Sequence, residues 1–398
     1  MRAEPTMRDL KPALEQRRND RLYRARRVAD SAQGPEMVLD GERVITFCSN
    51  DYLGLAGDER IAAALADAAR HWGAGSGAAH LVNGHARPHH ELEDALAAFT
   101  GRERALLFST GYMANLGVGS ALLARGDCAF EDRLNHASLI DAGYRPHVGF
   151  QRYRHNDATD LDRRLGRVAA EEKLVLTDGV FSMDGDVAPL RNLAAVCGRH
   201  EARLAVDDAH GIGVLGEGGR GSVAAAGLSA AEVPVLVGTL GKAFGTAGAF
   251  VAGDADLIET LIQSARTYIY TTAIPPAVAA ATLASLGIVE ASDDRRARLS
   301  ALIERFRAGI ADLDAEPVDS RTPIQPLIVG SAERALAVSD ALLEEGLLVT
   351  AIRPPTVPPN TARLRVTLSA THDETHIDRL LEALRRHLVG HAGSSVTP

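Results

Sequence analysis

Apolar and polar positions follow a repeating pattern along most of this 398-residue chain. Stretches with an apolar residue every three or four positions predict amphipathic helices. Short apolar runs between them predict strands that are buried on both faces, as parallel strands usually are. We expect these strands, each separated from the next by a helix, at residues 105–108, 128–130, 174–176, 204–206, 235–237 and 249–251. The alternation of strand and helix predicts an α/β fold with a doubly wound sheet.

The pattern changes twice, which predicts three parts. Residues 1–50 form an N-terminal arm, with an amphipathic helix over about 10–29 and a hairpin that turns at Asp40-Gly41. Residues 51–292 form a large domain, in which further helices are expected at 59–72, 88–99 and 277–289. Residues 293–398 form a small α+β domain, with helices over 295–313, 332–345 and 373–388 and strands over 324–329, 347–352 and 364–368.

Composition and charge narrow the class of protein. The hydrophobic content of 46% and the charged content of 24% are ordinary for a soluble globular protein. The net charge is −9 and the arginines are interspersed with acids, so we expect no nucleic-acid partner, although residues 17–27 predict a local basic helix. The longest apolar run, residues 277–289, is too short to span a bilayer, so no membrane partner is expected.

The cysteines and the N-terminus indicate where the protein acts. Cys48, Cys128 and Cys197 lie far apart and form no C-x-x-C pair, so neither a disulfide framework nor a zinc ribbon is predicted. The N-terminal residues are charged and lack the apolar core of a secretory signal. We therefore expect a reducing, cytoplasmic location.

Lysine is rare in this chain. Only three of the 43 basic residues are lysines, namely Lys11, Lys173 and Lys242. Lys242 lies in a turn of small residues that follows the strand expected at 235–237. Arginine serves salt bridges and solubility equally well, but it does not lose its proton near neutral pH to act as an amine nucleophile. Two interpretations stay open at this point: a surface lysine left by compositional drift, or a buried lysine that forms a Schiff base.

Other candidate groups follow the ends of the predicted strands, where open α/β sheets bind their ligands. A turn of small residues leads into a helix near Gly111, and a helix N-terminus is suited to a phosphate. Asp207 and His210 are compatible with a metal pair, half of a catalytic triad or a partner for a ring nitrogen. His136 follows another strand. The absence of a Gly-x-Ser-x-Gly elbow argues against an α/β-hydrolase.

Taken together, these groups match what pyridoxal phosphate requires. The phosphate would lie at the helix N-terminus, the aspartate would keep the pyridine nitrogen protonated, and the lysine would form the Schiff base. The competing glycine-rich segments, residues 73–77 and 216–221, lack the strand and helix that flank a dinucleotide-binding loop. We therefore predict a pyridoxal-phosphate enzyme without a metal.

At this level of detail the chain resembles the α-oxoamine synthases, pyridoxal-phosphate enzymes of fold type I, over nearly its whole length. The segments that carry the resemblance are 49–55, 75–77, 132–138, 179–186, 207–211, 239–242, 324–329 and 351–358. The resemblance implies a fold type I transferase, in which the large domain holds a mostly parallel central sheet flanked by helices. The arm and the small α+β domain would complete the fold.

The resemblance also implies roles for individual residues. Lys242 would form the Schiff base, Asp207 would pair with the pyridine nitrogen, and His210 would contact the ring hydroxyl. His136 would stack on the ring and also contact the substrate. The remaining residues implied around the cofactor are Gly111, Tyr112, Ser182 and Thr239, and Thr271 or Thr272 from the other subunit of a homodimer. The residues implied on the substrate side are Arg24, Asn50, Arg353 and Thr356, with Arg353 as the anchor of a carboxylate.

The implied reaction is a decarboxylating condensation of L-alanine with a pimeloyl thioester, of coenzyme A or of a carrier protein, on the pathway to biotin. The cofactor residues do not separate this reaction from that of a glycine C-acetyltransferase or a 5-aminolevulinate synthase. A fold type I aminotransferase or lyase and a catalytically inactive binding protein are further alternatives. The chain departs from the family pattern at Asp178, where glutamate is usual, and at Ala79-His80, where Ser/Thr-Arg is frequent.

Overall fold

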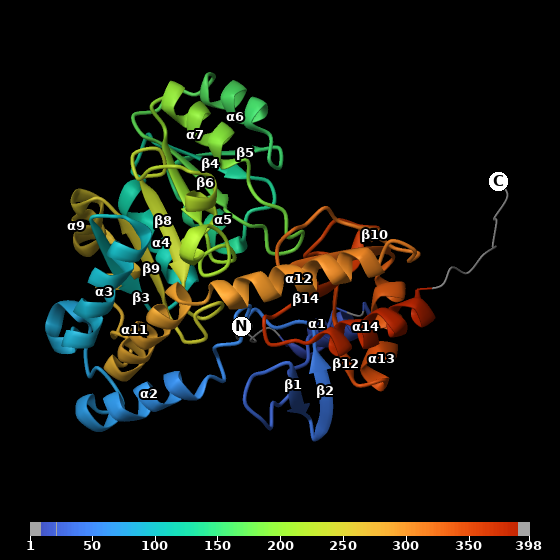
Figure 1. The fold of residues 1–398 in the computed structure, drawn as a ribbon. Coiled ribbons are helices and arrows are strands. Elements are labelled where there is room, and N and C mark those ends of the chain that lie inside the picture. Colours follow the sequence, from blue (N-terminus) through green and yellow to red (C-terminus); the bar gives the residue numbers. More distant parts are fainter. Residues whose placement is uncertain (1–8, 21, 389–398) are drawn as a thin grey trace, which may run out of the picture.

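The computed structural model describes residues 9–20 and 22–388, and the ends of the predicted arm and small domain, residues 1–8 and 389–398, lie outside it. A seven-stranded sheet occupies the centre of the large domain (Figure 1), in the order β3-β9-β8-β7-β6-β4-β5. Its strands are β3 (Arg104–Phe108), β4 (Cys128–Asp132), β5 (Gly149–Tyr153), β6 (Lys173–Asp178), β7 (Arg203–Asp207), β8 (Val235–Thr239) and β9 (Ala249–Gly253).

Six of these strands run in the same direction, and only β9 runs antiparallel to both of its neighbours in this sheet. The prediction of a helix between every two strands was therefore wrong for β8 and β9. Residues 240–248, which join them, form no helix, and a parallel crossover needs a dozen residues or more. The short connection makes the chain reverse direction, and this reversal carries Lys242.

Helices cover both faces of the sheet, which explains why its strands are apolar throughout. Leu106 and Phe108 pack on one face, whereas Ala105 and Leu107 pack on the other. The helices of the large domain are α2 (Glu59–Trp72), α3 (Arg87–Thr100), α4 (Gly111–Leu122), α5 (Ala137–Gly143), α6 (Ala158–Leu165), α7 (Leu190–Arg199), α8 (Ser222–Ala225), α9 (Ala255–Ser264), α10 (Arg266–Ile269) and α11 (Pro276–Glu290), with shorter turns η1 (His80–Gly84) and η2 (Glu217–Gly219).

A second, antiparallel sheet lies in the C-terminal part, in the order β10-β11-β14-β13. Its strands are β10 (Glu316–Pro317), β11 (Ile324–Gly330), β13 (Thr350–Ile352) and β14 (Ala362–Thr367), and its helices are α12 (Asp293–Gly309), α13 (Ala332–Glu344) and α14 (Glu374–His387). The single strand predicted over 347–352 is divided. Its first two residues form β12 (Leu347–Leu348), which pairs with the arm instead.

The arm is less helical than predicted. Helix α1 spans Lys11–Asn19, buries none of its residues and ends long before the predicted position 29. Without an apolar face to bury, only local propensity supports this helix, and Asn19 and Asp20 favour its end. The predicted hairpin is present: β1 (Glu36–Leu39) and β2 (Glu42–Thr46) pair antiparallel about Asp40 and Gly41, both at positive φ.

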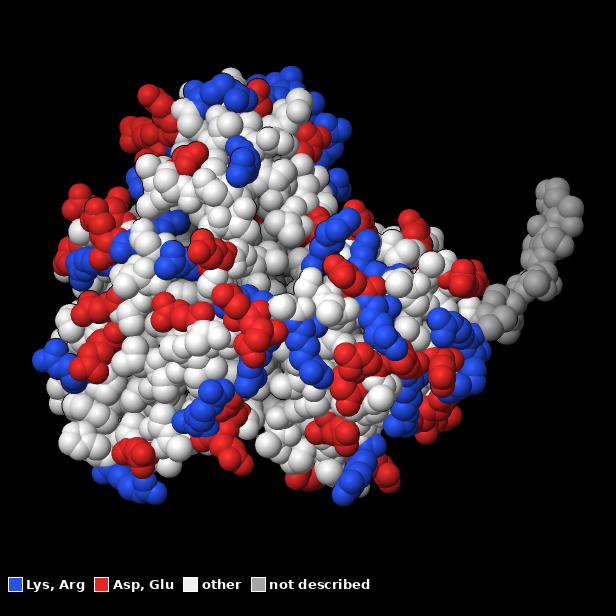
Figure 2. All heavy atoms as spheres, viewed as in Figure 1, with Lys and Arg blue, Asp and Glu red and all other residues white. Residues whose placement is uncertain are grey.

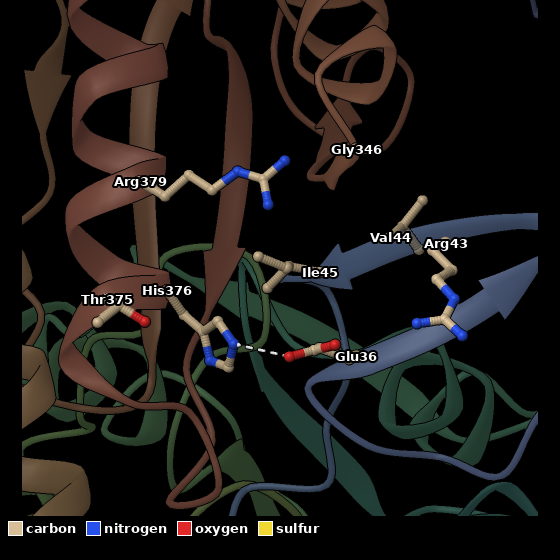
Figure 3. A pocket seen from close by; sticks show the side chains of 8 residues that line it. All are labelled: Glu36, Arg43, Val44, Ile45, Gly346, Thr375, His376 and Arg379. Atoms are coloured by element: carbon tan, nitrogen blue, oxygen red, sulfur yellow. Dashed lines mark hydrogen bonds and ion pairs between the residues drawn. The ribbon is translucent and has the colours of Figure 1, made fainter.

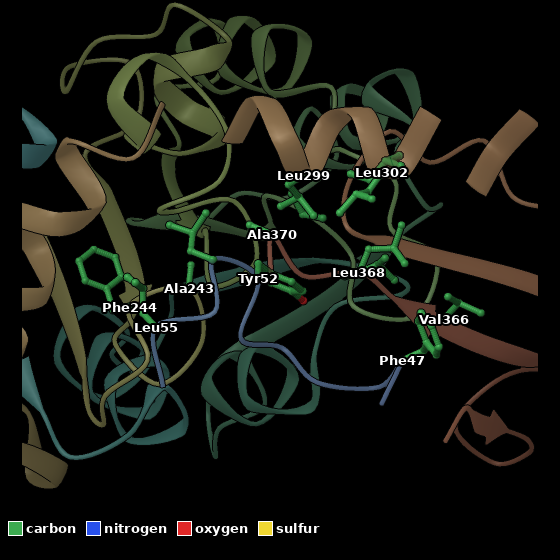
Figure 4. Packing of buried hydrophobic residues seen from close by; sticks show 14 of the residues in the cluster. Phe47, Tyr52, Leu55, Ala243, Phe244, Leu299, Leu302, Val366, Leu368 and Ala370 are labelled. Atoms are coloured by element: carbon green, nitrogen blue, oxygen red, sulfur yellow. The ribbon is translucent and has the colours of Figure 1, made fainter. Parts of the chain in front are cut away.

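The segment after the arm joins the two sheets. Phe47, Tyr52 and Leu55 are fully buried. Figure 4 shows Leu55 beside Phe244 of the large domain and Phe47 beside Val366 of the small one, with Tyr52 between these two groups. Burying each such side chain contributes roughly 1.5–3 kcal/mol to folding. This packing fixes the backbone on which Asn50 and Tyr52 stand. On the face shown in Figure 2, acidic and basic side chains are interspersed.

Candidate active site

Lys242 lies inside the molecule, in the reversal between β8 and β9. Its Nζ atom is 2.9 Å from Nε2 of His210, which follows the end of β7. Burial lowers the pKa of Lys242 below its ordinary value; the nearby carboxylates of Asp207 and Asp178 oppose this shift, and the Arg365 guanidinium adds to it. A lysine of lowered pKa supplies more neutral amine near pH 7, as a nucleophile or a general base requires.

A line of hydrogen bonds fixes the ring of His210. Its Nδ1 atom is 2.6 Å from the hydroxyl of Tyr52, which in turn donates to Oδ1 of Asn50 at 3.1 Å. Because the single Tyr52 proton goes to Asn50, His210 must donate from Nδ1, and its Nε2 is left as the acceptor for Lys242. Burial, followed by the charge of Lys242, lowers the pKa of His210 well below its ordinary value, so the imidazole is neutral.

The series of hydrogen bonds that begins at Lys242 ends at Arg365 of β14. Its Nη2 atom donates to Oδ1 of Asn50 at 3.2 Å, and its Nε atom donates to the carbonyl of Ser182 at 2.6 Å. The side chain is 7% exposed, and none of its hydrogen bonds within the described residues goes to a carboxylate. A buried guanidinium without a neighbouring anion is suited to bind an anionic ligand.

Asp207 ends β7, near Lys242. Its carboxylate accepts hydrogen bonds from the Asn115 amide at 2.6 Å and from the Ala209 N–H at 3.0 Å. Within residues 9–20 and 22–388 it forms no ion pair. Asp178, on the neighbouring strand, accepts the His136 N–H at 2.7 Å; burial and then the charge of Asp207 raise the pKa of Asp178 well above its ordinary value.

His136 is held above this group by a second set of hydrogen bonds. Its Nδ1 atom accepts from the Ser138 N–H at 3.3 Å and from the Ser138 hydroxyl at 2.7 Å. The hydroxyl accepts from Asn115, which also binds Asp207. Burial lowers the pKa of His136, so this imidazole is also neutral near pH 7. One amide thus positions both the carboxylate and the ring.

The start of α4 is open for an anion. Thr110 caps the helix by accepting the Met113 N–H at 3.2 Å, whereas the N–H groups of Gly111 and Tyr112 have no helical acceptor. A Cβ atom at Gly111 would meet nothing within 4 Å. Thr239 at the end of β8 donates its hydroxyl to the Gly248 carbonyl at 3.3 Å.

Thr271 and Thr272 are placed differently from the residues above. Thr272 forms an antiparallel bridge with Ala79, and Ala273 donates its N–H to the Ala78 carbonyl at 3.0 Å. Within the part of the chain that the structure describes, neither threonine shares a hydrogen bond with the Lys242 group. Large apolar side chains are exposed around this bridge: Leu81 is 52%, Val82 78% and Tyr270 71% exposed.

Arg24, Arg353 and Thr356 line a separate open cavity of about 650 Å³. It lies between the arm and the loop that follows β13, and its wall also includes Arg17 and the consecutive residues Pro354-Pro355. The predicted substrate residues are therefore divided: Asn50 and His136 belong to the buried Lys242 group, and the other three belong to the cavity.

A further hollow of about 400 Å³ lies between β1, β2 and α14. Figure 3 shows Glu36 and His376 facing one another across it, with Oε1 and Nε2 3.3 Å apart. None of the eight residues that line it is a predicted site residue.

The residues of the Lys242 group fit pyridoxal phosphate. The open first turn of α4 suits the phosphate, and the unpaired carboxylate of Asp207 suits a cationic ring nitrogen. The amine of Lys242 is hydrogen-bonded to an uncharged partner, which leaves it able to react with an aldehyde. The residues are thus complementary to the phosphate, the ring nitrogen and the aldehyde of the cofactor.

Sequence reasoning did not assign Tyr52, Asn115 or Arg365 to the site. Tyr52 and Asn115 each stood within or beside a segment already singled out, so their positions were a usable signal. Arg365 is signalled by its strand, since Arg363 and Arg365 alternate with Ala362, Leu364 and Val366 in a run that is buried throughout. Two arginines on one face of a buried strand require anionic or carbonyl partners.

Several known proteins are similar to this chain over most of its length. Residues 42–384 match the family Aminotransferase class I and II. An 8-amino-7-oxononanoate synthase of Thioalkalivibrio sulfidiphilus is 65% identical over 385 residues, covering 96% of this chain and 98% of the relative. A solved 8-amino-7-oxononanoate synthase from Francisella tularensis is 33% identical with a TM-score of 0.76, covering 86% of this chain and 97% of that one. A serine palmitoyltransferase from S. paucimobilis, solved with a bound PLP–myriocin aldimine, is 33% identical with a TM-score of 0.89, covering 95% and 96%.

Proposed function

Because the chain belongs to the 8-amino-7-oxononanoate synthases, within the aminotransferase class I and II family, we propose that the Lys242 group is its catalytic centre. The reaction joins L-alanine to a pimeloyl thioester and gives 8-amino-7-oxononanoate, carbon dioxide and a free thiol in biotin biosynthesis, with pyridoxal phosphate as cofactor. The observation that carries the assignment is a buried lysine of lowered pKa, 2.9 Å from a neutral histidine.

The residues around Lys242 hold and tune the cofactor. When bound, it supplies an aldehyde for amines and a ring that accepts electrons. Asp207 keeps the ring nitrogen charged, and Asn115 holds the carboxylate in place. The N–H groups of Gly111 and Tyr112 would bind the phosphate, and Thr239 would lie near it. His136 would stack on the ring, and Ser182 would line the site beside Arg365.

Lys242 acts as the base at the α carbon of alanine. Its lowered pKa leaves the amine neutral at working pH, so Nζ removes the α-proton and later returns a proton to the product. His210 accepts from Nζ and keeps it directed at this position, while Tyr52 and Asn50 fix the His210 tautomer. His136 donates from Nε2 toward the thioester carbonyl, because its Nδ1 atom is occupied by Ser138.

The two arginine sites divide the substrate carboxylates between them. Arg365 lies in the buried group beside Asn50, so we assign it the carboxylate of alanine. Arg353 and Arg24 lie in the open cavity with Thr356, so we assign them the distal carboxylate of the pimeloyl chain. A second cationic site favours a dicarboxylic acyl donor over an acetyl donor, which has no charge at that end.

We also infer a homodimer. Leu81, Val82 and Tyr270 form an exposed apolar group beside the Thr272–Ala79 bridge, and a second subunit would cover it. This arrangement would bring Thr271 or Thr272 to the phosphate of the partner site. Light scattering should give twice the mass of the chain, and Val82→Arg should give the single mass.

The three free cysteines, Cys48, Cys128 and Cys197, support a cytoplasmic location for this dimer. None of the helices of the described residues is long and apolar enough to cross a membrane.

The deciding experiment supplies alternative substrate pairs. Purified enzyme loaded with pyridoxal phosphate is incubated with L-alanine and pimeloyl-CoA, and in parallel with glycine and acetyl-CoA or succinyl-CoA. We expect free thiol and carbon dioxide mainly from the first pair. Thiol and carbon dioxide from the glycine reactions alone would contradict the assignment. Keto-acid formation without loss of thioester would indicate an aminotransferase.

A further inference from the structure

A group of titratable side chains outside the catalytic centre lies at the start of α3. The segment from His80 to Glu93 carries four histidines, and the turn η1 and the first two turns of the helix bring them together. None of them belongs to the site described above. Two overlapping sets of three have their potential ligand atoms within 4.8 Å of one another, and both contain His85.

His89 is not available as a ligand, which selects between the two sets. Its Nδ1 atom accepts the Ala86 N–H at 2.9 Å, and its Nε2 atom donates to the Ile274 carbonyl at 2.7 Å. Both ring nitrogens are therefore occupied by backbone groups. The other set, made of His85, His90 and Glu93, has donor atoms to spare.

The atoms of this second set face one another. Nε2 of His85 is 3.9 Å from Oε2 of Glu93, whereas Oε1 of Glu93 accepts the Leu107 N–H at 3.0 Å. His90 and Glu93 are three residues apart on α3, so they lie on one face of the helix. Glu93 is largely buried, with its side chain 12% exposed, while the side chains of His85 and His90 are 31% and 56% exposed. The group thus has a fixed carboxylate at its base and an open side toward solvent.

His80 orients the ring of His85. Their Nδ1 atoms are 2.9 Å apart, so one ring donates to the other. His80 is itself held by stacking on Tyr268, with ring centroids 5.0 Å apart and planes inclined by 13°. A histidine that binds a metal commonly uses its second ring nitrogen in such a hydrogen bond, which fixes the tautomer and the ring orientation. With Nδ1 occupied, Nε2 of His85 is the nitrogen directed at Glu93.

We propose that His85, His90 and Glu93 bind a divalent transition metal ion such as Zn²⁺, with His80 as the residue that positions His85. Two imidazoles and one carboxylate form a donor set that zinc accepts, with water in the remaining position. Ligand atoms lie about 2.0–2.2 Å from a bound zinc ion, and each of the three ligand atoms would have to move by less than about 1 Å to reach that distance. The ion would connect the loop before α3 to the helix itself, beside the segment that carries Thr272.

The test is a metal titration of the tag-free, cofactor-loaded enzyme after dialysis against a chelator. We expect one equivalent of Zn²⁺ per chain by calorimetry, and Co²⁺ should give the visible absorption of a site with nitrogen and oxygen ligands. Zn²⁺ should also raise the unfolding temperature, because binding to the folded state stabilises it. His90→Gln should weaken zinc binding at least about 10-fold, and His71→Gln, at an exposed histidine of α2, should leave it unchanged.

A second variant separates loss of a ligand from loss of the fold. His85→Gln should abolish the cobalt absorption while circular dichroism and cofactor absorbance stay as in the unchanged enzyme. His80→Gln should retain binding with reduced affinity. The proposal is wrong if the unchanged enzyme takes up no zinc at micromolar concentrations. It is equally wrong if His85→Gln and His90→Gln bind zinc as the unchanged enzyme does.

Discussion

The buried centre around Lys242 and the open cavity around Arg353 are built in opposite ways. The centre takes its side chains from the ends of β7 and β8, from the middle of β14 and from the buried segment after the arm. Hydrogen bonds of 2.6–3.2 Å connect Lys242 to Arg365 through three residues. The cavity takes its side chains from the arm and from one loop. Arg24 and Thr356 are exposed there.

The difference indicates which part determines chemistry and which part determines specificity. In the centre the polar side chains are hydrogen-bonded to one another, so the removal of one group changes the pKa or the orientation of another. In the cavity the arginines act separately and remain hydrated, so each contributes modestly. Substitutions in the centre should therefore change turnover, and substitutions in the cavity should change the affinity for one substrate.

Lys242→Arg should have the largest effect. The substitution retains the positive charge but removes an amine that can be neutral near pH 7. We expect kcat to fall by at least about 10³-fold, since both the proton transfer and the attachment to the cofactor are lost. Steady-state assays with L-alanine and pimeloyl-CoA measure the fall, and circular dichroism checks the fold. Retention of more than a tenth of the activity would show that Lys242 is not the base.

Arg365→Lys should have the second-largest effect on activity. Lysine keeps the charge but does not reach both the Ser182 carbonyl and the Asn50 amide, so the carboxylate of alanine loses a fixed partner. We expect kcat/KM for alanine to fall by about 10²-fold, which corresponds to about 2.7 kcal/mol. Arg363→Lys, on the same strand but bonded to Asp184, is the matched control and should change kcat/KM far less. Equal losses in both variants would mean that Arg365 acts only on the fold.

The pH profile distinguishes the charge of Arg365 from its geometry. Since Lys242 must be neutral to act, kcat/KM falls as the pH falls through its pKa. The Arg365 guanidinium helps to lower that pKa. Arg365→Gln removes the charge and should move the acid limb to higher pH, whereas Arg365→Lys should leave the limb in place. Identical acid limbs in the two variants would contradict this coupling.

The fold could be predicted largely from the apolar pattern, because burial on both faces leaves a strong signature. The helices predicted at 59–72 and 277–289 are present within a residue or so of the expected ends. Strand direction was less accessible. The antiparallel strand β9 is as apolar as its neighbours, and only the shortness of residues 240–248 indicates the reversal. Strand β5 was missed because one of its ends is exposed and its sequence carries Gln151 and Arg152.

The site was predictable where chemistry is concentrated in one residue. The scarcity of lysine and the position of Lys242 after a strand made it a candidate, and the neighbouring Asp207, His210 and Gly111 turn favoured the Schiff-base interpretation. Residues that act through others were not predictable in this way: Tyr52 and Arg365 lie 190 and 123 positions from Lys242 in the chain, and only the packing of both sheets on one segment brings them to it. Local sequence drew attention to the segment of Tyr52 and to the arginines of β14, but it did not indicate that these side chains meet Lys242.

Arg353→Gln tests the cavity side of the comparison. The side chain is partly exposed, so its pairing with the distal carboxylate of the pimeloyl chain should be worth less than the buried pairing at Arg365. We expect KM for pimeloyl-CoA to rise by about 10-fold with kcat nearly unchanged. Heptanoyl-CoA, which lacks the distal carboxylate, should be used equally well by both enzymes. Arg26→Gln is the control, since Arg26 is exposed and does not line the cavity.

The smallest effect is expected at His155, which supports the loop that carries Ser182. Its ring bridges Asp132 at 2.9 Å and Asp186 at 2.8 Å. Burial alone would lower the pKa of His155, but the hydrogen bonds to both carboxylates outweigh it and raise the pKa to about 10. Because the folded pKa lies above the unfolded value, the stabilisation is complete below about pH 6.5 and is lost as the pH rises through about 10.

His155→Gln should therefore lower the unfolding temperature by about 2–4 °C at pH 6, and the difference should shrink toward pH 10. Differential scanning calorimetry across this range measures the trend. His200→Gln is a suitable control, because His200 pairs only with the half-exposed Asp162. A difference that stays constant with pH would mean that the ring acts through packing against Phe181 rather than through its charge. The loop that carries Ser182 would then be held in place by packing at His155, and not by the charge of the ring.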